Sequence, residues 1–183
     1  MDLKDRNYRI FGRTKGRSKN KLNLDLYKTL LKKFNLNNIK LNKKFILDIG
    51  SGYGETSLYL SSKYDQSNII SCDKYINGNL NLLKIIDKEK INNIFVHDGN
   101  VLEILDNFQN KIFFKLVFIF FPDPWPKKKH NKRRLITTTF LEKLHMSVEQ
   151  NGHIYIVTDS TDYTNHIILC LFKLKRLFLW LNP

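Results

Sequence analysis

The sequence has few of the residues that build disulfide frameworks and metal sites, with two cysteines and five histidines among 183 residues. Cys72 and Cys170 both lie in strongly apolar stretches, which fits buried thiols in a reducing cytosol better than a disulfide framework or a metal site. Four of the histidines show no spacing typical of metal ligands: His97, His145, His153 and His166. We therefore expect no metal and a cytoplasmic location.

Long apolar runs are also missing. The first twenty residues are polar and cationic, so they lack the apolar core of a signal peptide. The one membrane-like stretch, 167–181, is interrupted by Lys173, Lys175 and Arg176, which argues against a transmembrane helix. With 42% hydrophobic residues, the chain is expected to form one globular domain with modest extensions.

Acidic residues are scarce relative to basic ones, and the excess of positive charge is confined to two segments. The chain has 31 Lys and Arg against 17 Asp and Glu, a net charge of +14. Residues 1–44 hold 14 Lys and Arg against three Asp, and residues 127–134 hold six with no acid. A compositional bias could raise the number of lysines, but it would not gather them in two places. The distribution predicts a face that binds nucleic acid.

The four prolines are few, but three of them fall within five residues. The run Pro122-Asp123-Pro124-Trp125-Pro126 follows an apolar stretch, 116–121, that is typical of a strand buried on both faces. A carboxylate and an indole therefore stand at the carboxyl end of a predicted central strand. In open α/β sheets, ligands bind at that end of the strands.

Strand and helix patterns alternate along the chain. Strands are predicted at 45–49, 69–72, 94–96, 116–121 and 154–157, and helices at 22–36, 55–64, 78–88, 101–108 and 134–149, with Gly152 ending the last helix. This order indicates an α/β fold with a doubly wound, mostly parallel, Rossmann-like sheet and helices on both faces. We expect a basic arm and helix over 1–44, a catalytic domain over 45–166 and an atypical tail over 167–183.

The eight glycines are also clustered, and Gly50, Gly52 and Gly54 join the first strand to the first helix of the domain. Such glycines let a ligand approach the backbone at a helix N-terminus. A dinucleotide fingerprint would need a further glycine at position 55, where Glu55 stands. An acid there disfavours a pyrophosphate, and Asp48 suits a cationic group. The motif favours S-adenosylmethionine over a nicotinamide cofactor.

Two polar residues follow the next strands. Asp73 is placed to accept hydrogen bonds from ribose hydroxyls, and the alternative is a helix cap or turn. Asn100 could read the adenine edge through its amide, and capping of the following helix is an equally good interpretation.

Asp123 and Trp125 suggest a nucleobase site. The flanking prolines restrict the backbone of Asp123, whose carboxylate matches the donor edge of guanine. Trp125 offers a stacking face worth about 1–3 kcal/mol per base. A proline-rich turn with a buried indole is the competing interpretation. Asp159, at the end of the last predicted strand, is expected to contact the base or to cap a helix. Phosphate contacts are predicted for the basic run: Lys127, Lys128, Lys129, Arg133 and Arg134.

These motifs together resemble one family, the bacterial tRNA (guanine-N7)-methyltransferases of the class I, Rossmann-like type. The resemblance is carried by residues 12–17, 47–54, 120–127, 130–134 and 158–159, and 122–125 is the most specific part. It implies methyl transfer from S-adenosylmethionine to N7 of a guanine at position 46 in the variable loop of tRNA. By position in the motifs it implies the following roles: cofactor contacts at Asp48, Gly50, Gly52, Asp73, Asn100 and Asp123, catalysis by Asp123, and substrate contacts at Lys127 and Asp159.

The chain departs from the family pattern in three places. Asp48 stands where Glu is frequent, and Asn100 stands where Asp is usual. The family continues with a further pair of strands, whereas this sequence stops at Pro183 with a segment unlike the family's. The resemblance therefore predicts a shortened sheet with an exposed edge. We expect a monomer or a weak homodimer. A catalytically impaired RNA-binding remnant is the alternative function.

Overall fold

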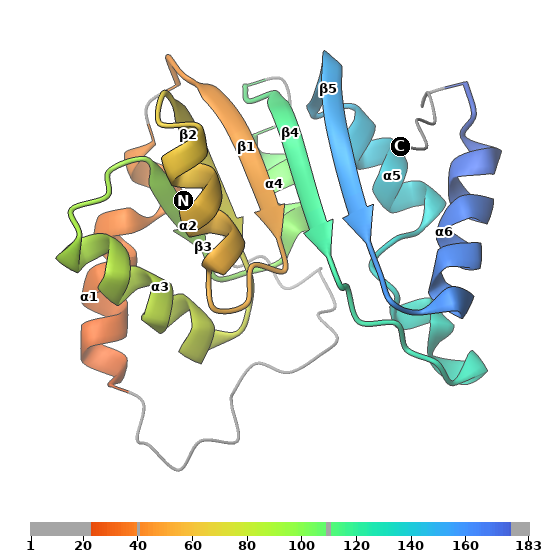
Figure 1. The fold of residues 1–183 in the computed structure, drawn as a ribbon, viewed down its shortest axis with the longest axis horizontal. Helices are drawn as coiled ribbons and strands as arrows, with labels where there is room; N and C mark the ends of the chain where they lie inside the picture. The colour runs from red at the N-terminus through yellow and green to blue at the C-terminus, as the bar shows by residue number, and fades with distance from the viewer. Residues whose placement is uncertain (1–22, 40, 109–110, 177–183) are drawn as a thin grey trace.

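The fold is built on a five-stranded, all-parallel sheet, in a computed structural model that describes residues 23–39, 41–108 and 111–176. The strand order is β3-β2-β1-β4-β5 (Figure 1). The strands are β1 (Lys44–Ile49), β2 (Ser67–Cys72), β3 (Ile94–His97), β4 (Phe114–Phe120) and β5 (Val148–Val157). Each strand predicted from the sequence is confirmed, with ends that differ by up to six residues.

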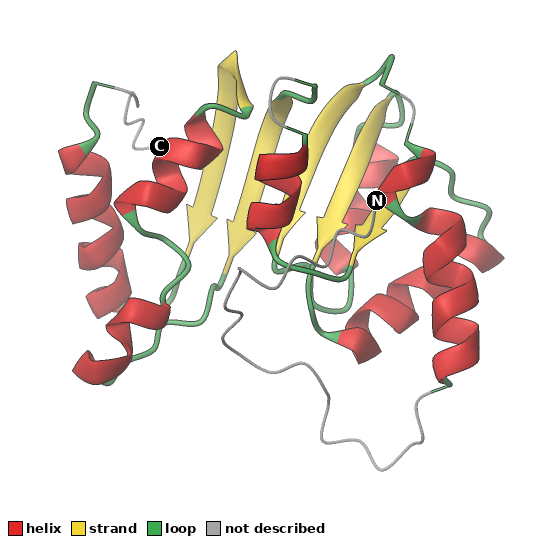
Figure 2. Ribbon diagram, turned by 180° about the vertical axis from the view of Figure 1, so that it is seen from behind, coloured by secondary structure: helices red, strands yellow, loops and turns green. Residues whose placement is uncertain are grey.

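Helices cover both faces of this sheet. They are α1 (Leu24–Phe34), α2 (Glu55–Lys63), α3 (Ile76–Lys88), α4 (Val101–Asn107), α5 (Thr138–His145) and α6 (Thr161–Lys173), with two short 3-10 helices, η1 (Leu36–Asn38) and η2 (Lys128–Arg133). One face packs against α1, α2 and α3, and the other, turned to the viewer in Figure 2, packs against α4, α5 and α6. Two apolar cores result, and the doubly wound α/β fold is confirmed.

Burial along the strands follows from this layering. Every residue of β2 is buried, and β1 is buried from Phe45 onward, because these central strands have helices on both sides. β4 is fully buried on the face that packs against α4, α5 and α6, whereas on the other face only Leu116 is buried. Phe118 and Phe120 are half-buried on that other face, where Tyr155 of β5 stacks on Phe118 with ring centroids 5.0 Å apart. The prediction that this strand is buried on both faces therefore holds at Leu116 and Val117 and is wrong at Phe118 and Phe120, because α1, α2 and α3 lie over the β1–β2–β3 half of that face (Figure 1).

The region between β4 and β5 differs most from the sequence prediction. The helix predicted over 134–149 is the shorter α5, and Gly152 lies within β5 instead of ending a helix. The β4–β5 register shifts, so that Phe114 pairs with Val148 and Leu116 with His153. A Cβ on Gly152 would lie 2.5 Å from a Val148 methyl and 2.9 Å from the Phe114 carbonyl oxygen. Glycine is required here by this irregularity in the sheet, which periodicity does not reveal.

The end of the described chain belongs to the core. α6 runs through the boundary expected between 166 and 167, and Ile167 and Cys170 are buried. Among the described residues, no helix has both the length and the apolar character needed to cross a bilayer. The predicted basic arm (1–21) and residues 177–183 lie outside the described residues.

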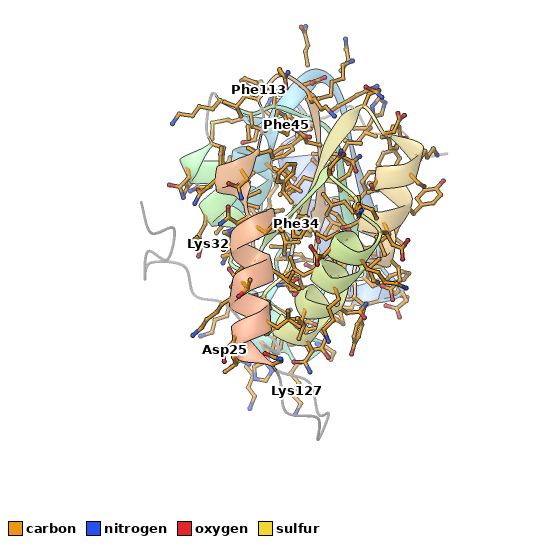
Figure 3. All side chains as sticks on the ribbon, turned by 90° about the vertical axis from the view of Figure 1, so that its left-hand side faces the viewer. Asp25, Lys32, Phe34, Phe45, Phe113 and Lys127 are labelled. Atoms are coloured by element: carbon orange, nitrogen blue, oxygen red, sulfur yellow. The ribbon has the colours of Figure 1, made fainter. Side chains whose placement is uncertain are left out.

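Figure 3 shows the two ends of the molecule from the α1 side. Phe45 and Phe113, near the amino ends of β1 and β4, lie at one end, and Lys127 lies at the other. α1 stands beside α3 and reaches from one end toward the other. Lys127 therefore lies at the end toward which the parallel strands point.

Candidate active site and nucleic-acid interface

The loops at the carboxyl ends of the strands enclose a cavity of about 1280 Å³. It lies where the strand order reverses, because β1 leads to α2 on one face and β4 leads to α5 on the other. Six of the predicted site residues line it: Gly50, Asp73, Asn100, Asp123, Trp125 and Arg133, and the buried Arg134 is a seventh.

The glycine turn leaves its backbone open to a ligand. Gly50 and Gly52 have φ values of 77° and 57°, in the left-handed region that favours glycine. A Cβ placed on either would meet no atom within 4 Å, so there is free space beside this backbone. Gly54 is glycine for another reason, since its Cβ would lie 2.7 Å from a Leu82 methyl. The turn fits the close approach of a cofactor.

Asp73 joins the glycine turn to the loop after β2. Its Oδ2 accepts a hydrogen bond from the Gly52 N–H at 2.8 Å, and its Oδ1 accepts one from the Tyr75 N–H at 2.9 Å. The half-buried carboxylate also lines the cavity. Each carboxylate oxygen can accept a second bond, so the turn role does not exclude hydroxyl donors from a ligand.

Asp48 lies deeper than the other acids. It is 2% exposed, does not line the cavity, and accepts a hydrogen bond from the Ser57 hydroxyl at 2.6 Å. Burial raises the pKa of Asp48 to about 6; the bond from Ser57 opposes the shift and the charge of Asp73 adds to it. In the structure this residue ties the end of β1 to α2. A direct cofactor contact stays a prediction.

Asn100 fits both of its interpretations. Its Oδ1 caps α4 by accepting from the Leu102 N–H at 3.0 Å, and the residue lines the cavity. The buried pair of His97 and Glu103, 3.0 Å apart, lies beneath the same loop. Sequence reasoning passed over Asp98, which directly follows β3 and lies 3.1 Å from the hydroxyl of Tyr27 on α1. Asp98 could have been found from its position in the sequence, because it directly follows β3 as Asp73 directly follows β2.

The loop after β4 presents Asp123 to the cavity from a distorted backbone. Phe121 and Trp125, on either side, have φ values of 48° and 43°, which non-glycine residues rarely adopt. The Phe121 N–H donates to the Val157 carbonyl at 2.8 Å, which fixes the start of the loop to β5. The structure thus brings Asp123 and the glycine turn to one cavity, as the sequence predicted.

The Trp125 ring packs against two neighbouring side chains. The Arg133 guanidinium lies 5.0 Å from its ring centroid, and the His130 ring meets it at 5.8 Å, edge to face. Base stacking on Trp125 stays a prediction, with Arg133 already packed on the indole. The pKa of His130 is lowered by desolvation and by the charges of Arg133, Lys127 and Lys132. His130 is therefore held toward its neutral form.

The basic run divides into exposed and buried members. Lys127, Lys128 and Lys129 are exposed, as a phosphate-binding surface requires. Arg134 is 4% exposed, donates from Nε to the Pro124 carbonyl at 2.8 Å and pairs with Asp162 through Nη2. The structure thus gives this guanidinium protein partners, in place of the phosphate that the sequence suggested.

Asp159 is exposed after β5, does not line the cavity, and leaves the cap of α6 to Ser160. Its predicted contact with the base stays a prediction.

Lys74, which the sequence analysis did not single out, lines the cavity beside Asp73. Burial lowers the pKa of Lys74, and the charges of Asp123 and Asp73 oppose that shift. Within the described ranges, no group of three or more His, Cys, Asp or Glu side chains is arranged to hold a metal.

The sheet order defines a Rossmann-like fold, and a family model identifies the class as methyltransferase. Two solved structures share the fold: precorrin-6y C5,15-methyltransferase from Geobacter metallireducens (TM-score 0.57, 15% identity, 81% of this chain and 70% of that one) and an rRNA methylase from Streptococcus thermophilus (TM-score 0.50, 11% identity, 79% and 75%). A family model described as "Putative methyltransferase" matches residues 42–178.

Two relatives narrow the class further, both named tRNA (guanine-N(7)-)-methyltransferase. The protein from Neorickettsia sennetsu is 32% identical over 161 residues, covering 87% of this chain and 72% of its own. The protein from Wolbachia pipientis wMel is 36% identical over 146 residues, covering 75% and 66%. The chain belongs to the tRNA (guanine-N7)-methyltransferase family. It spans 72% and 66% of the length of these relatives, and 50% of a third from Polaromonas sp. (strain JS666).

Proposed function

We propose that this protein transfers a methyl group from S-adenosylmethionine to N7 of a guanine in tRNA, at position 46 in the variable loop. The observation that carries the proposal is that Asp123 and the glycine turn at Gly50 line one cavity, with Arg133 also in its wall. The names of the relatives support the choice of tRNA and of guanine N7.

The described residues fit the cofactor by their chemistry. Gly50 and Gly52 leave space beside the backbone, which a bulky amino acid and sulfonium group can approach. Asp73 would accept hydrogen bonds from the ribose hydroxyls, and Asn100 would meet the adenine edge. When bound, S-adenosylmethionine supplies an activated methyl group, and it carries no phosphate that Glu55 would repel.

The protein's part in the chemistry is alignment and electrostatics. N7 of guanine has a free lone pair, so no base must remove a proton before attack. Positive charge develops on the guanine as the methyl group is transferred, and a carboxylate beside the ring stabilises it. Asp123, which lines the cavity, would take this role and would also accept hydrogen bonds from the donor edge of guanine.

The exposed lysines of the basic run would hold the tRNA backbone. Lys127, Lys128 and Lys129 lie at the same end of the molecule as the cavity, where Lys127 is labelled in Figure 3. Phosphate contacts of this kind give affinity that falls with salt and carries little sequence information. Base selection then falls to Asp123, Trp125 and Asp159. A cytoplasmic location and a monomer or weak homodimer belong to the same proposal.

The test is methyl transfer from labelled S-adenosylmethionine to unmodified tRNA, followed by nucleoside analysis. N7-methylguanosine is expected, and it should disappear when adenine replaces guanine at position 46. Binding of tRNA without any N7-methylguanosine would instead indicate an RNA-binding remnant. A thermal shift with S-adenosylhomocysteine and none with NAD is expected from the cofactor assignment.

A further inference from the structure

Arg134 stands out in the basic run because its guanidinium is turned into the protein. Its side chain is 2% exposed, although it follows a stretch of solvent-facing lysines. Nε donates to the Pro124 carbonyl oxygen at 2.8 Å, Nη2 pairs with the Asp162 carboxylate, and the guanidinium lies 5.0 Å from the Tyr163 ring centroid. Three different groups therefore fix this one side chain.

The hydrogen bond from Arg134 to the Pro124 carbonyl holds the loop that carries Asp123. Pro124 directly follows Asp123, in a loop bounded by the left-handed φ values of Phe121 and Trp125. Such backbone conformations persist only where the surroundings impose them. The Phe121 N–H bond to the Val157 carbonyl fixes one end of the loop. The Asn131 amide, oriented to satisfy its hydrogen bonds, donates to the Trp125 carbonyl at 3.1 Å and fixes the other. Arg134 supplies the contact between these two ends.

The groups on the far side of Arg134 belong to the first turn of α6. Tyr163 is fully buried, and its hydroxyl accepts a hydrogen bond from the Ile136 N–H at 3.0 Å. Asp162 lies in the first turn of α6, where a carboxylate is favoured by the helix dipole. Arg134 thus connects the Asp123 loop to the start of a helix that is packed in the core.

We propose that Arg134 is a positioning residue, which holds the Pro124 carbonyl so that the Asp123 carboxylate stays at the cavity. This inference rests on the proposed function, because it assigns Arg134 to the same methyl transfer. It differs from a phosphate contact, in which the guanidinium would face solvent. Arginine suits the role because its planar fork can reach Pro124 and Asp162 at once, which a lysine ammonium on a flexible stem does not reproduce.

The experiment compares Arg134→Lys with Asp162→Asn in the full chain. Arg134→Lys keeps the charge and loses the fork, and kcat should fall by on the order of 10- to 100-fold, since small misplacements of a reacting group have effects of that size. Affinity for tRNA and its salt dependence should stay within about twofold of the parent. Asp162→Asn should lower kcat in the same direction, and the double variant should be no slower than Arg134→Lys alone.

A second readout follows the loop without turnover. In a Trp180→Phe background, Trp125 is the only indole, and its accessibility to acrylamide should rise in both Arg134→Lys and Asp162→Asn. Arg176→Lys, at an exposed arginine, is the matched control and should leave kcat and quenching unchanged. If Arg134→Lys does not fold, the Asp162→Asn variant, altered at a side chain that is 69% exposed, carries the test.

The outcomes separate this inference from the proposed function. Weaker tRNA binding with unchanged kcat and quenching in Arg134→Lys would overturn the positioning role and restore the phosphate contact. Independent, additive effects of the two substitutions would overturn it as well. A parent protein that makes no N7-methylguanosine would refute the proposed function, while the quenching of Trp125 would still decide whether Arg134 orders the loop.

Discussion

The hydroxyl of Tyr27 lies 3.1 Å from a carboxylate oxygen of Asp98, and this contact joins α1 to the loop after β3. Tyr27 is 5% exposed, and burial, with the charge of Asp98, raises the pKa of its phenol above the ordinary value. The phenol therefore keeps its proton and donates a hydrogen bond to the Asp98 carboxylate. The N-terminal helix is fixed to the rim of the site by a charge-assisted hydrogen bond.

Removal of this hydroxyl should loosen α1. We expect Tyr27→Phe to lower the free energy of unfolding by about 1–3 kcal/mol, since Asp98 no longer accepts this hydrogen bond and is left half-buried. Urea denaturation measures the change. Tyr59→Phe, at a side chain that is 59% exposed, is the control and should change stability by less than about 0.5 kcal/mol. Equal small effects at both positions would contradict the role given to Tyr27.

Asp48 should make the protein less stable as the pH rises toward neutrality. Burial raises its pKa from 3.8 to about 6, so between about pH 4 and pH 6 the folded state binds more protons than the unfolded state. Above that window the cost is about 3 kcal/mol, the equivalent of two pKa units. Asp48→Asn keeps an acceptor for Ser57 and should gain stability over the parent as pH rises from 4 to 7. Denaturation at several pH values checks this, with Asp65→Asn, at an exposed site, as a variant expected to run parallel to the parent.

Asp123 should matter for the reaction more than for binding. Asp123→Ala is expected to abolish methyl transfer while tRNA affinity stays nearly intact, because the lysines hold the backbone and the carboxylate acts on the base. Single-turnover assays and tRNA titrations measure the two separately. Asp65→Ala should change neither. A parallel loss of affinity and turnover would show that Asp123 maintains the loop structure instead.

The basic run should set the salt dependence of tRNA binding. Replacement of Lys127, Lys128 and Lys129 by Gln should weaken binding and reduce the slope of log affinity against log salt by up to about 3, because each lysine that neutralises a phosphate adds roughly one to the slope. Titrations at several salt concentrations give the slope. The matched control replaces three exposed lysines in and just after α3, away from the basic run: Lys84, Lys88 and Lys90. A slope that changes equally in both would mean that tRNA does not favour the Lys127 face.

The sequence predicted the structure correctly where the local residue pattern matches the place of the segment in the sheet. Apolar runs such as 45–49 and 69–72 are strands because they fill the centre of the sheet, and the glycines at 50 and 52 mark the turn that follows. The sequence also pointed correctly to a loop at the cavity, where Pro122 and Pro124 flank Asp123.

Features set by distant contacts could not be predicted. Nothing in the run 127–134 distinguishes Arg134 from its neighbours, since its burial depends on Asp162 and Tyr163 some thirty residues later. The left-handed φ of Trp125 and the irregularity at Gly152 depend in the same way on partners across the sheet. Periodicity describes one segment at a time, so it extended the helix at 134–149 into what is the first part of β5.

Under the proposed function, the reversal of strand order between β1 and β4 would give the two halves of the molecule largely separate duties. Apart from Asp123, which is predicted to contact both ligands, the predicted cofactor contacts Gly50, Asp73 and Asn100 follow β1, β2 and β3, whereas the groups assigned to the nucleic acid follow β4 and β5. A lineage could therefore remodel its RNA preference in one half and leave the methyl-donor pocket of the other unchanged.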